Sequence, residues 1–89
     1  MAALRFTQNL QRHVACEGGS VQGATVREVL EAYFARNQAA RGYVLDEHGA
    51  LRHHMMIFVD GKPIGDRKAL SDPVNPESEL DVIQALSGG

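Results

Sequence analysis

Apolar and polar residues alternate at the start of the chain, where Leu4 and Phe6 stand on either side of Arg5. A period of two is typical of a strand with one buried face, so we expect a strand over residues 2–7. A cluster of glycine and serine then marks a turn, and a second, short strand is expected at residues 21–22. The sequence therefore predicts two strands before any helix.

The pattern then changes to a helical one. Thr25 and Glu28 match the capping box, in which a threonine caps the first turn and a glutamate three residues later reaches back. Apolar residues follow at the spacing of one helical face, at Val26, Val29, Leu30, Tyr33 and Phe34. We expect one helix over residues 26–36 and an irregular segment over residues 38–50.

The second half of the chain again favours strands. Residues 54–59 are a dense apolar run, and the Asp-Gly pair at 60–61 is a hairpin signal that leads into a short arm at 62–64. Residues 66–70 are expected to form one short helical turn, and residues 79–85 the last strand. Met55, Ile57 and Val59 are expected to face the helix, as are Leu80 and Val82 of the last strand.

This order of elements predicts an α+β fold. One apolar helical stripe and several half-apolar strands are best buried as a mixed sheet of four to five strands packed on one main helix. The loop lengths favour a β-grasp, the ubiquitin-like architecture. We expect the β-grasp domain to span residues 1–85 and a flexible Gly-Gly tail to occupy residues 86–89.

Size and charge narrow the function. A single domain of 89 residues leaves little room for an enclosed active site, which favours a carrier, a binding module or a small subunit. The net charge of −2 argues against nucleic-acid binding, and neither a membrane span nor a signal peptide is visible. Cys16 is the one cysteine, which favours a reducing compartment, so we expect a cytoplasmic protein that is a monomer when free.

The chain resembles the ThiS/MoaD family of ubiquitin-like sulfur carriers, which includes thiamine sulfur carriers, molybdopterin synthase small subunits and the cysteine-synthesis carrier. The features that carry the resemblance are the Leu4/Phe6 strand, the capped helix after Gly23-Ala24-Thr25, the run Ile57-Phe58-Val59-Asp60-Gly61, the strand from Leu80 to Leu86 and the final Gly88-Gly89. The segment from Tyr43 to His53 looks most like the cysteine-synthesis carrier.

The resemblance implies a function without catalytic machinery or a bound cofactor in the carrier itself. A ubiquitin-activating-type enzyme would use ATP and magnesium to adenylate the carboxylate of Gly89. A sulfur donor would convert the adenylate to a thiocarboxylate, and a biosynthetic enzyme would accept the sulfur. Cysteine, molybdopterin, thiamine and a specialised metabolite remain possible products. A lysine-conjugated protein modifier and a permanent subunit of a molybdopterin-synthase-like enzyme are the alternatives.

The tail and one surface are the predicted site. Gly88 and Ser87 are slim enough for a narrow channel in a partner enzyme, and glycine permits unusual backbone angles. If alternate residues of the strands face the helix, an apolar patch for partner binding remains on the other face, formed by Met56, Phe58, Ile83 and Leu86.

Other polar residues give weaker signals. His53 and His54 are expected to point to opposite faces of a strand, so no metal site is predicted. Lys62, Arg67 and Lys68 form a small basic group in the sequence, either as a solvated loop or as a group that steers an acidic partner.

Overall fold

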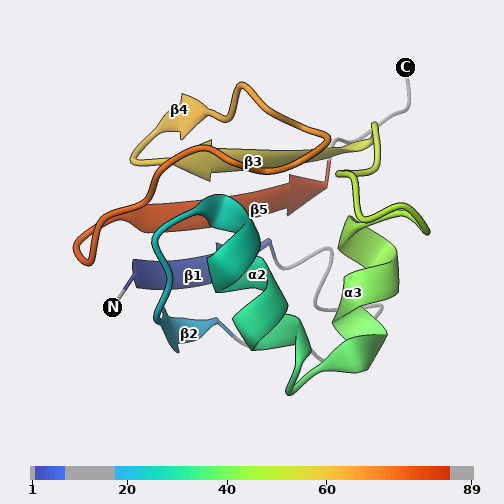
Figure 1. The fold of residues 1–89 in the computed structure, drawn as a ribbon, viewed down its shortest axis with the longest axis horizontal. Coiled ribbons are helices and arrows are strands. Elements are labelled where there is room, and N and C mark those ends of the chain that lie inside the picture. The colour runs from blue at the N-terminus through green and yellow to red at the C-terminus, as the bar shows by residue number, and fades with distance from the viewer. Residues whose placement is uncertain (1, 8–17, 85–89) are drawn as a thin grey trace.

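The computed structural model describes residues 2–7 and 18–84 of the chain. Its elements, in chain order, are β1 (Ala2–Phe6), β2 (Gly19–Val21), α2 (Val26–Phe34), α3 (Gln38–Val44), β3 (Met55–Val59), β4 (Lys62–Pro63) and β5 (Glu79–Gln84) (Figure 1). The predicted strands are all found, with ends that differ from the predictions by one or two residues at most positions.

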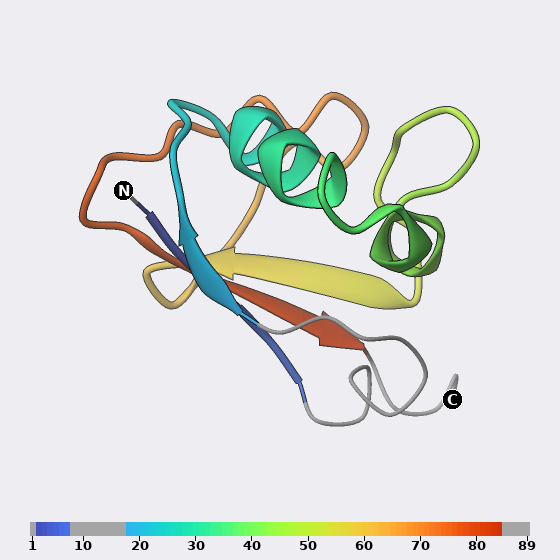
Figure 2. The same cartoon turned by 90° about the horizontal axis from the view of Figure 1, so that it is seen from below.

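The five described strands form one mixed sheet in the order β2-β1-β5-β3-β4. β1 and β5 run parallel at the centre, while the outer pairs are antiparallel. Both described helices lie on the same face of the sheet, and no helix of residues 2–7 and 18–84 lies on the other face, here called the uncovered face (Figure 2). The predicted α+β architecture with a mixed sheet is confirmed.

The core lies between the helices and the covered face. Leu80 and Val82 of β5 are fully buried there, and so are Met55 and Ile57 of β3. The stripe of α2 meets them, with Val26, Val29 and Leu30 at 0% exposure and Phe34 at 2%. Burial of the apolar faces of α2 and the sheet is the main stabilising contribution.

Local signals explain where α2 begins. The hydroxyl of Thr25 accepts a hydrogen bond of 3.2 Å from the amide of Glu28, as the capping box predicts. The Glu28 carboxylate reaches one residue further back than the motif requires and accepts from the amide of Ala24 at 2.9 Å. The helix ends at Phe34, two residues earlier than predicted, because the following amides bond to carbonyls three residues back and tighten the turn.

The segment predicted to be irregular contains a second helix, α3, so that prediction was wrong. Only Ala40 and Val44 of α3 are buried, and the Asn37 side chain makes no capping bond. Gly42 in its interior further weakens the sequence signal. Tertiary contacts compensate: Arg41 pairs with Glu31 of α2 at 3.2 Å, and Arg52 donates to the carbonyl of Gly42 at 2.8 Å. Neither helix, at nine and seven residues, is long enough to cross a membrane.

The two predicted turns of the second half are present. Asp60 and Gly61 both have positive φ, 52° and 85°, as a two-residue hairpin between β3 and β4 requires. The amide of Leu70 donates to the carbonyl of Asp66 at 3.0 Å, which closes the predicted helical turn. The Asp66 carboxylate accepts bonds from the Ser71 hydroxyl and the amides of Lys68 and Ala69, and these bonds lower its pKa to about 2.

Candidate functional site

Three residues of the predicted patch lie on the uncovered face of the sheet. Met56 and Phe58 alternate with the buried residues of β3, and Ile83 alternates with those of β5. The register places Met56 directly opposite Ile83. The predicted orientation of the strands is therefore confirmed, and the two β-strands bring these apolar side chains together. Leu86, the fourth predicted member, lies outside the described residues.

The patch is less exposed than the sequence suggested. Met56, Phe58 and Ile83 are each half-buried. Side chains directly opposite each other on adjacent strands are close enough to cover part of one another, which explains this intermediate exposure. The uncovered face therefore presents a strip of half-buried apolar side chains, called the apolar strip.

A charged ladder borders this strip. The Arg5 guanidinium of β1 donates to both carboxylate oxygens of Asp81, at 2.8 and 3.1 Å, and lies 2.9 Å from the Glu79 carboxylate. The bond to Asp81 and the two negative charges raise the pKa of Arg5 above its ordinary value. Asp81 is also opposite Phe58 in the register, so the apolar strip and the ladder are adjacent.

The strands also determine where the chain continues toward the predicted tail. Because β1 and β5 are parallel, their carboxyl ends reach the same edge of the sheet. A cavity of about 430 Å³ lies there, lined by Phe6 of β1 and Thr7 just after it, by Val82 and Ile83 of β5, and by the Arg5–Asp81 pair. The chain passes from Gln84 into residues 85–89 at this edge. Ser87, Gly88 and Gly89, the other predicted site residues, lie outside the described residues.

The chemistry of this face suits docking. Met56, Phe58 and Ile83 are apolar, and Arg5 forms ion pairs with Asp81 and Glu79; both kinds of group recognise a complementary surface. An apolar strip beside an ordered ladder of charges gives a partner both a desolvated contact and a fixed orientation.

The histidine prediction needs a correction. His53 and His54 lie in a turn before β3 and not on a strand, so the expected separation onto opposite faces does not apply. Both are exposed, and their ring centroids are 6.3 Å apart in an edge-to-face arrangement. Among residues 2–7 and 18–84, no group of three or more histidine, cysteine or acidic residues is arranged to hold a metal ion.

The basic group of the sequence is divided in the structure. Lys62 belongs to β4, where it pairs with Val59. Arg67 and Lys68 instead line a second pocket together with Arg52, His53 and His54. Sequence reasoning missed this grouping, because Arg52 and Arg67 are brought together only by the fold. The Arg67 guanidinium donates to the carbonyls of Arg52 and Met55, at 2.8 Å each.

The sequence and the fold were compared with known proteins. The model of the ThiS family matches residues 11–89. No curated protein matches the sequence. Among solved structures, the Amycolatopsis orientalis BexX/CysO complex contains a chain with a TM-score of 0.83 and 19% identity, with complete coverage of both chains.

Two further structures show the same fold. SAMP1 from Haloferax volcanii has a TM-score of 0.80 and 22% identity, over 99% of this chain and 98% of that one. CysO from Mycobacterium tuberculosis, described as an antigen, has a TM-score of 0.80 and 16% identity, over 97% of this chain and 100% of that one. These likenesses confirm the predicted β-grasp architecture.

Proposed function

The chain belongs to the ThiS family of ubiquitin-like proteins, and we propose that it is a sulfur carrier activated at the carboxylate of Gly89. The observation that carries the proposal is the position of the outer apolar strip. Met56 and Ile83 lie on the uncovered face, beside the edge at which β5 leads into residues 85–89. A partner that holds this strip therefore lies next to the segment that it has to receive.

The proposed reaction has two steps. In the first, a carboxylate oxygen of Gly89 attacks the α-phosphorus of ATP in a separate adenylating enzyme, and pyrophosphate leaves. In the second, the sulfur of a donor attacks the acyl carbon, and AMP leaves with the bonding electrons. With hydrosulfide as the attacking sulfur, the new C–S bond replaces the C–O bond to AMP, the S–H proton passes to solvent, and Gly89 carries a thiocarboxylate that a biosynthetic enzyme can use. ATP and magnesium act in the partner enzyme, and the carrier supplies the acyl group.

The small tail residues suit this chemistry. Gly88 and Gly89 lack a Cβ, and Ser87 is small, so the backbone can enter a narrow channel. Phe58, Met56, Ile83 and Leu86 would hold the carrier outside that channel while the carboxylate reacts. The crystallised complex of a CysO chain with BexX supports the proposal that proteins of this fold work while docked on a larger partner. We place the reaction in the cytoplasm, where thiols stay reduced.

Intact mass tests the proposal. The purified chain is incubated with an extract of its source cells, ATP, Mg²⁺ and a sulfide source, and its mass is then measured. We expect a gain of about 16 Da, because sulfur replaces one oxygen. A chain without Gly88 and Gly89 should gain no mass. The matched control is Gly19→Ala, since a Cβ at Gly19 meets no atom within 4 Å. Sulfur incorporation into the truncated chain would contradict the proposal.

The second candidate is a protein modifier. The likeness to SAMP1 favours it, because the name stands for small archaeal modifier protein 1 in the similar structure from Methanosarcina acetivorans. A modifier would join Gly89 to a lysine of another protein through an isopeptide bond. It would appear in the same extract as a tagged adduct on larger chains that requires ATP, whereas a carrier appears as the free chain with added sulfur.

A further inference from the structure

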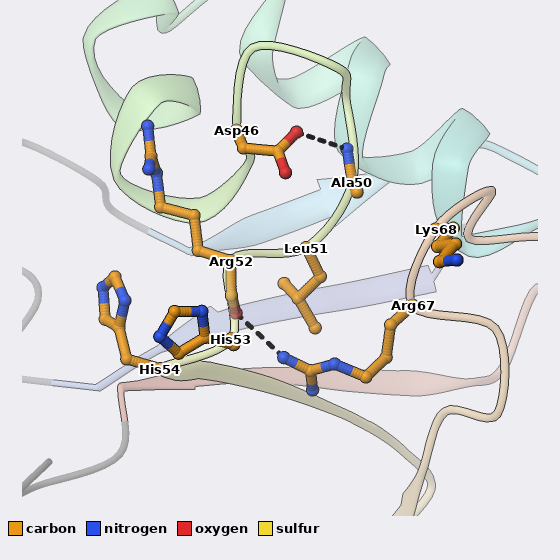
Figure 3. A pocket seen from close by; sticks show the side chains of 8 residues that line it. All are labelled: Asp46, Ala50, Leu51, Arg52, His53, His54, Arg67 and Lys68. Carbon is orange, nitrogen blue, oxygen red and sulfur yellow. Dashed lines mark hydrogen bonds between the residues drawn. The ribbon is translucent and has the colours of Figure 1, made fainter.

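A second pocket lies at the tail-bearing edge, where the loop before β3 meets the segment after β4. It has a volume of about 440 Å³, and its lining residues are Asp46, Ala50, Leu51, Arg52, His53, His54, Arg67 and Lys68. Figure 3 shows that Leu51 lies between Arg52 and Lys68, which come from opposite sides of the pocket. Leu51 itself is only 5% exposed, so the pocket has an apolar floor and a cationic rim.

The cations of this rim differ from three other arginines, Arg5, Arg27 and Arg41, which form ion pairs. Arg5 pairs with Asp81 and Glu79, while Arg27 and Arg41 both pair with Glu31. Over residues 2–7 and 18–84, no carboxylate forms an ion pair with Arg52, Arg67 or Lys68. Three basic residues therefore line one pocket in a chain whose net charge is −2, with the Arg52 side chain turned toward α3 (Figure 3).

The one carboxylate of the lining is already occupied. Asp46 accepts hydrogen bonds from the amides of His48 and Ala50, at 2.8 and 3.0 Å. The bond from Ala50 is the main reason that the pKa of Asp46 is lowered. Asp46 therefore holds the loop that forms one wall of the pocket. Its single negative charge is outnumbered by the positive charges of Arg52, Arg67 and Lys68.

Two of the cations are held in place by the backbone. The Arg67 guanidinium is bound to the carbonyls of Arg52 and Met55, and Arg52 donates its Nε–H to the carbonyl of Gly42. Their side chains lose less conformational entropy when a ligand binds, because the carbonyl contacts already restrict them. The pocket is thus a preorganised positive surface.

The pocket is also close to the start of the tail. Met55, the first residue of β3, pairs with Gln84, the last described residue of β5. His53 and His54 immediately precede Met55, so the rim of the pocket adjoins the point from which residues 85–89 continue. Five residues reach at most about 17 Å from Gln84. A protein that binds the tail is therefore within reach of this pocket.

We propose that the pocket binds an acidic peptide segment of the protein that receives the tail. A glutamate or aspartate of that segment pairs with the cations of the rim, and an apolar neighbour covers Leu51. The spread of the cations around the floor matches an extended segment with several carboxylates, whereas one phosphate requires donors that converge on a point. The identity of the partner rests on the proposed function, but binding of an acidic segment does not.

A binding measurement tests this site. The ¹⁵N-labelled chain is titrated with a short peptide that has glutamates on both sides of a central leucine, and amide shifts are followed by NMR. We expect the amides of Leu51, Arg52 and Lys68 to move most, and raised salt to weaken binding because exposed charges are screened. The same peptide with glutamine in place of glutamate should leave these amides unchanged.

Two lysine variants provide the matched comparison. Lys68→Glu reverses a charge on the rim, and within the described residues the Lys68 side chain makes no ion pair, while its hydrogen bonds are those of the backbone. It should weaken peptide binding about fivefold, the upper range for one exposed ion pair. Lys62→Glu makes the same change of net charge on β4, away from the pocket, and should leave the affinity within twofold of the unchanged chain.

Three results would overturn the proposal: equal weakening by the two variants, equal binding of the glutamine peptide, or shifts of the pocket amides with inorganic phosphate and none with the acidic peptide. These outcomes are separable from the carrier function. If the chain gains sulfur mass but the acidic peptide does not bind, only the pocket proposal fails. If the peptide binds and no sulfur is gained, only the carrier proposal fails.

Discussion

The two faces of the central sheet differ although they are built from the same strands. On β5, Leu80 and Val82 are fully buried under the helices, whereas Asp81 and Ile83 between and after them are half-buried on the other face. The covered face holds the fold together through apolar packing. The uncovered face carries an apolar strip and an ion-pair ladder. Their residues Met56, Phe58, Ile83, Arg5 and Asp81 lie outside the hydrophobic core.

This difference teaches how a small domain separates stability from recognition. An 89-residue chain buries too little surface to give up core positions to function. Alternation along a strand solves the problem, because adjacent residues of one strand contribute to opposite faces. Substitutions on the two faces should therefore affect different measurements.

The largest effect is expected on the covered face. Leu80→Ala removes a side chain that is 0% exposed, in a strand paired on both sides. The cavity and the lost burial should lower the free energy of unfolding by about 2–5 kcal/mol. For a domain of this size, thermal melting should show a midpoint lowered by more than about 10 °C. Leu80→Met is the control, because it conserves volume; an equal loss in both variants would contradict the packing explanation.

The second effect is expected on the uncovered face. Phe58→Asp places a charge in the apolar strip and should weaken binding to the activating partner about thirtyfold, as loss of a binding hot spot does. Its melting midpoint should fall by less than that of Leu80→Ala, since Phe58 is outside the core and only the new carboxylate opposite Asp81 opposes folding. Tyr43→Asp is the matched control, because Tyr43 on α3 is the most exposed large apolar residue described, at 44%. Normal partner binding by folded Phe58→Asp would remove the patch from the proposed site.

Much of this division was predictable from the sequence. The period of two in β3 and β5 correctly identified Met55, Ile57, Leu80 and Val82 as inward-facing, because burial of one face imposes that pattern. The capping box identified the start of α2. Such local signals work where a single element determines its own hydrogen bonds and burial.

Other features depend on contacts between distant segments. α3 escaped prediction because Ala40 and Val44 alone contact the core, and its support comes from Glu31 and Arg52 elsewhere in the chain. The basic pocket escaped for the same reason, since Arg52 and Arg67 are fifteen positions apart. The roles assigned to Ser87, Gly88 and Gly89 remain predictions.

A third substitution asks whether the covered side depends only on apolar contacts. Arg27 of α2 donates to the carbonyls of Gly49, Lys68 and Ala69, at distances from 2.6 to 3.2 Å. Arg27→Met should lower the free energy of unfolding by about 1–2 kcal/mol, because carbonyls of two loops lose a charged donor. Chemical denaturation measures this loss. Arg27→Lys should lose less free energy of unfolding than Arg27→Met but still some, since one ammonium cannot bridge the same carbonyls. Full stability of Arg27→Lys would show that only the positive charge matters and not the geometry of the guanidinium.

The smallest effect is expected at Asp66, in the loop that packs beside α2. Its carboxylate accepts bonds from the Ser71 hydroxyl and from the amides of Lys68, Ala69 and Ser71, and its pKa is lowered from 3.8 to about 2. A lowered pKa means that the ionised form is favoured in the folded chain. Its contribution to stability is therefore fully present above pH 4 and is lost as the pH falls toward 2.

Asp66→Asn should remove this part of the acid sensitivity, because the amide does not titrate. The melting midpoint of the unchanged chain should fall between pH 4 and pH 2 by more than that of the variant. Glu77→Gln provides the control, since the exposed Glu77 carboxylate accepts no hydrogen bond within the described residues. Equal acid sensitivity in the unchanged chain and in Asp66→Asn would show that the loop on the covered side does not depend on this carboxylate.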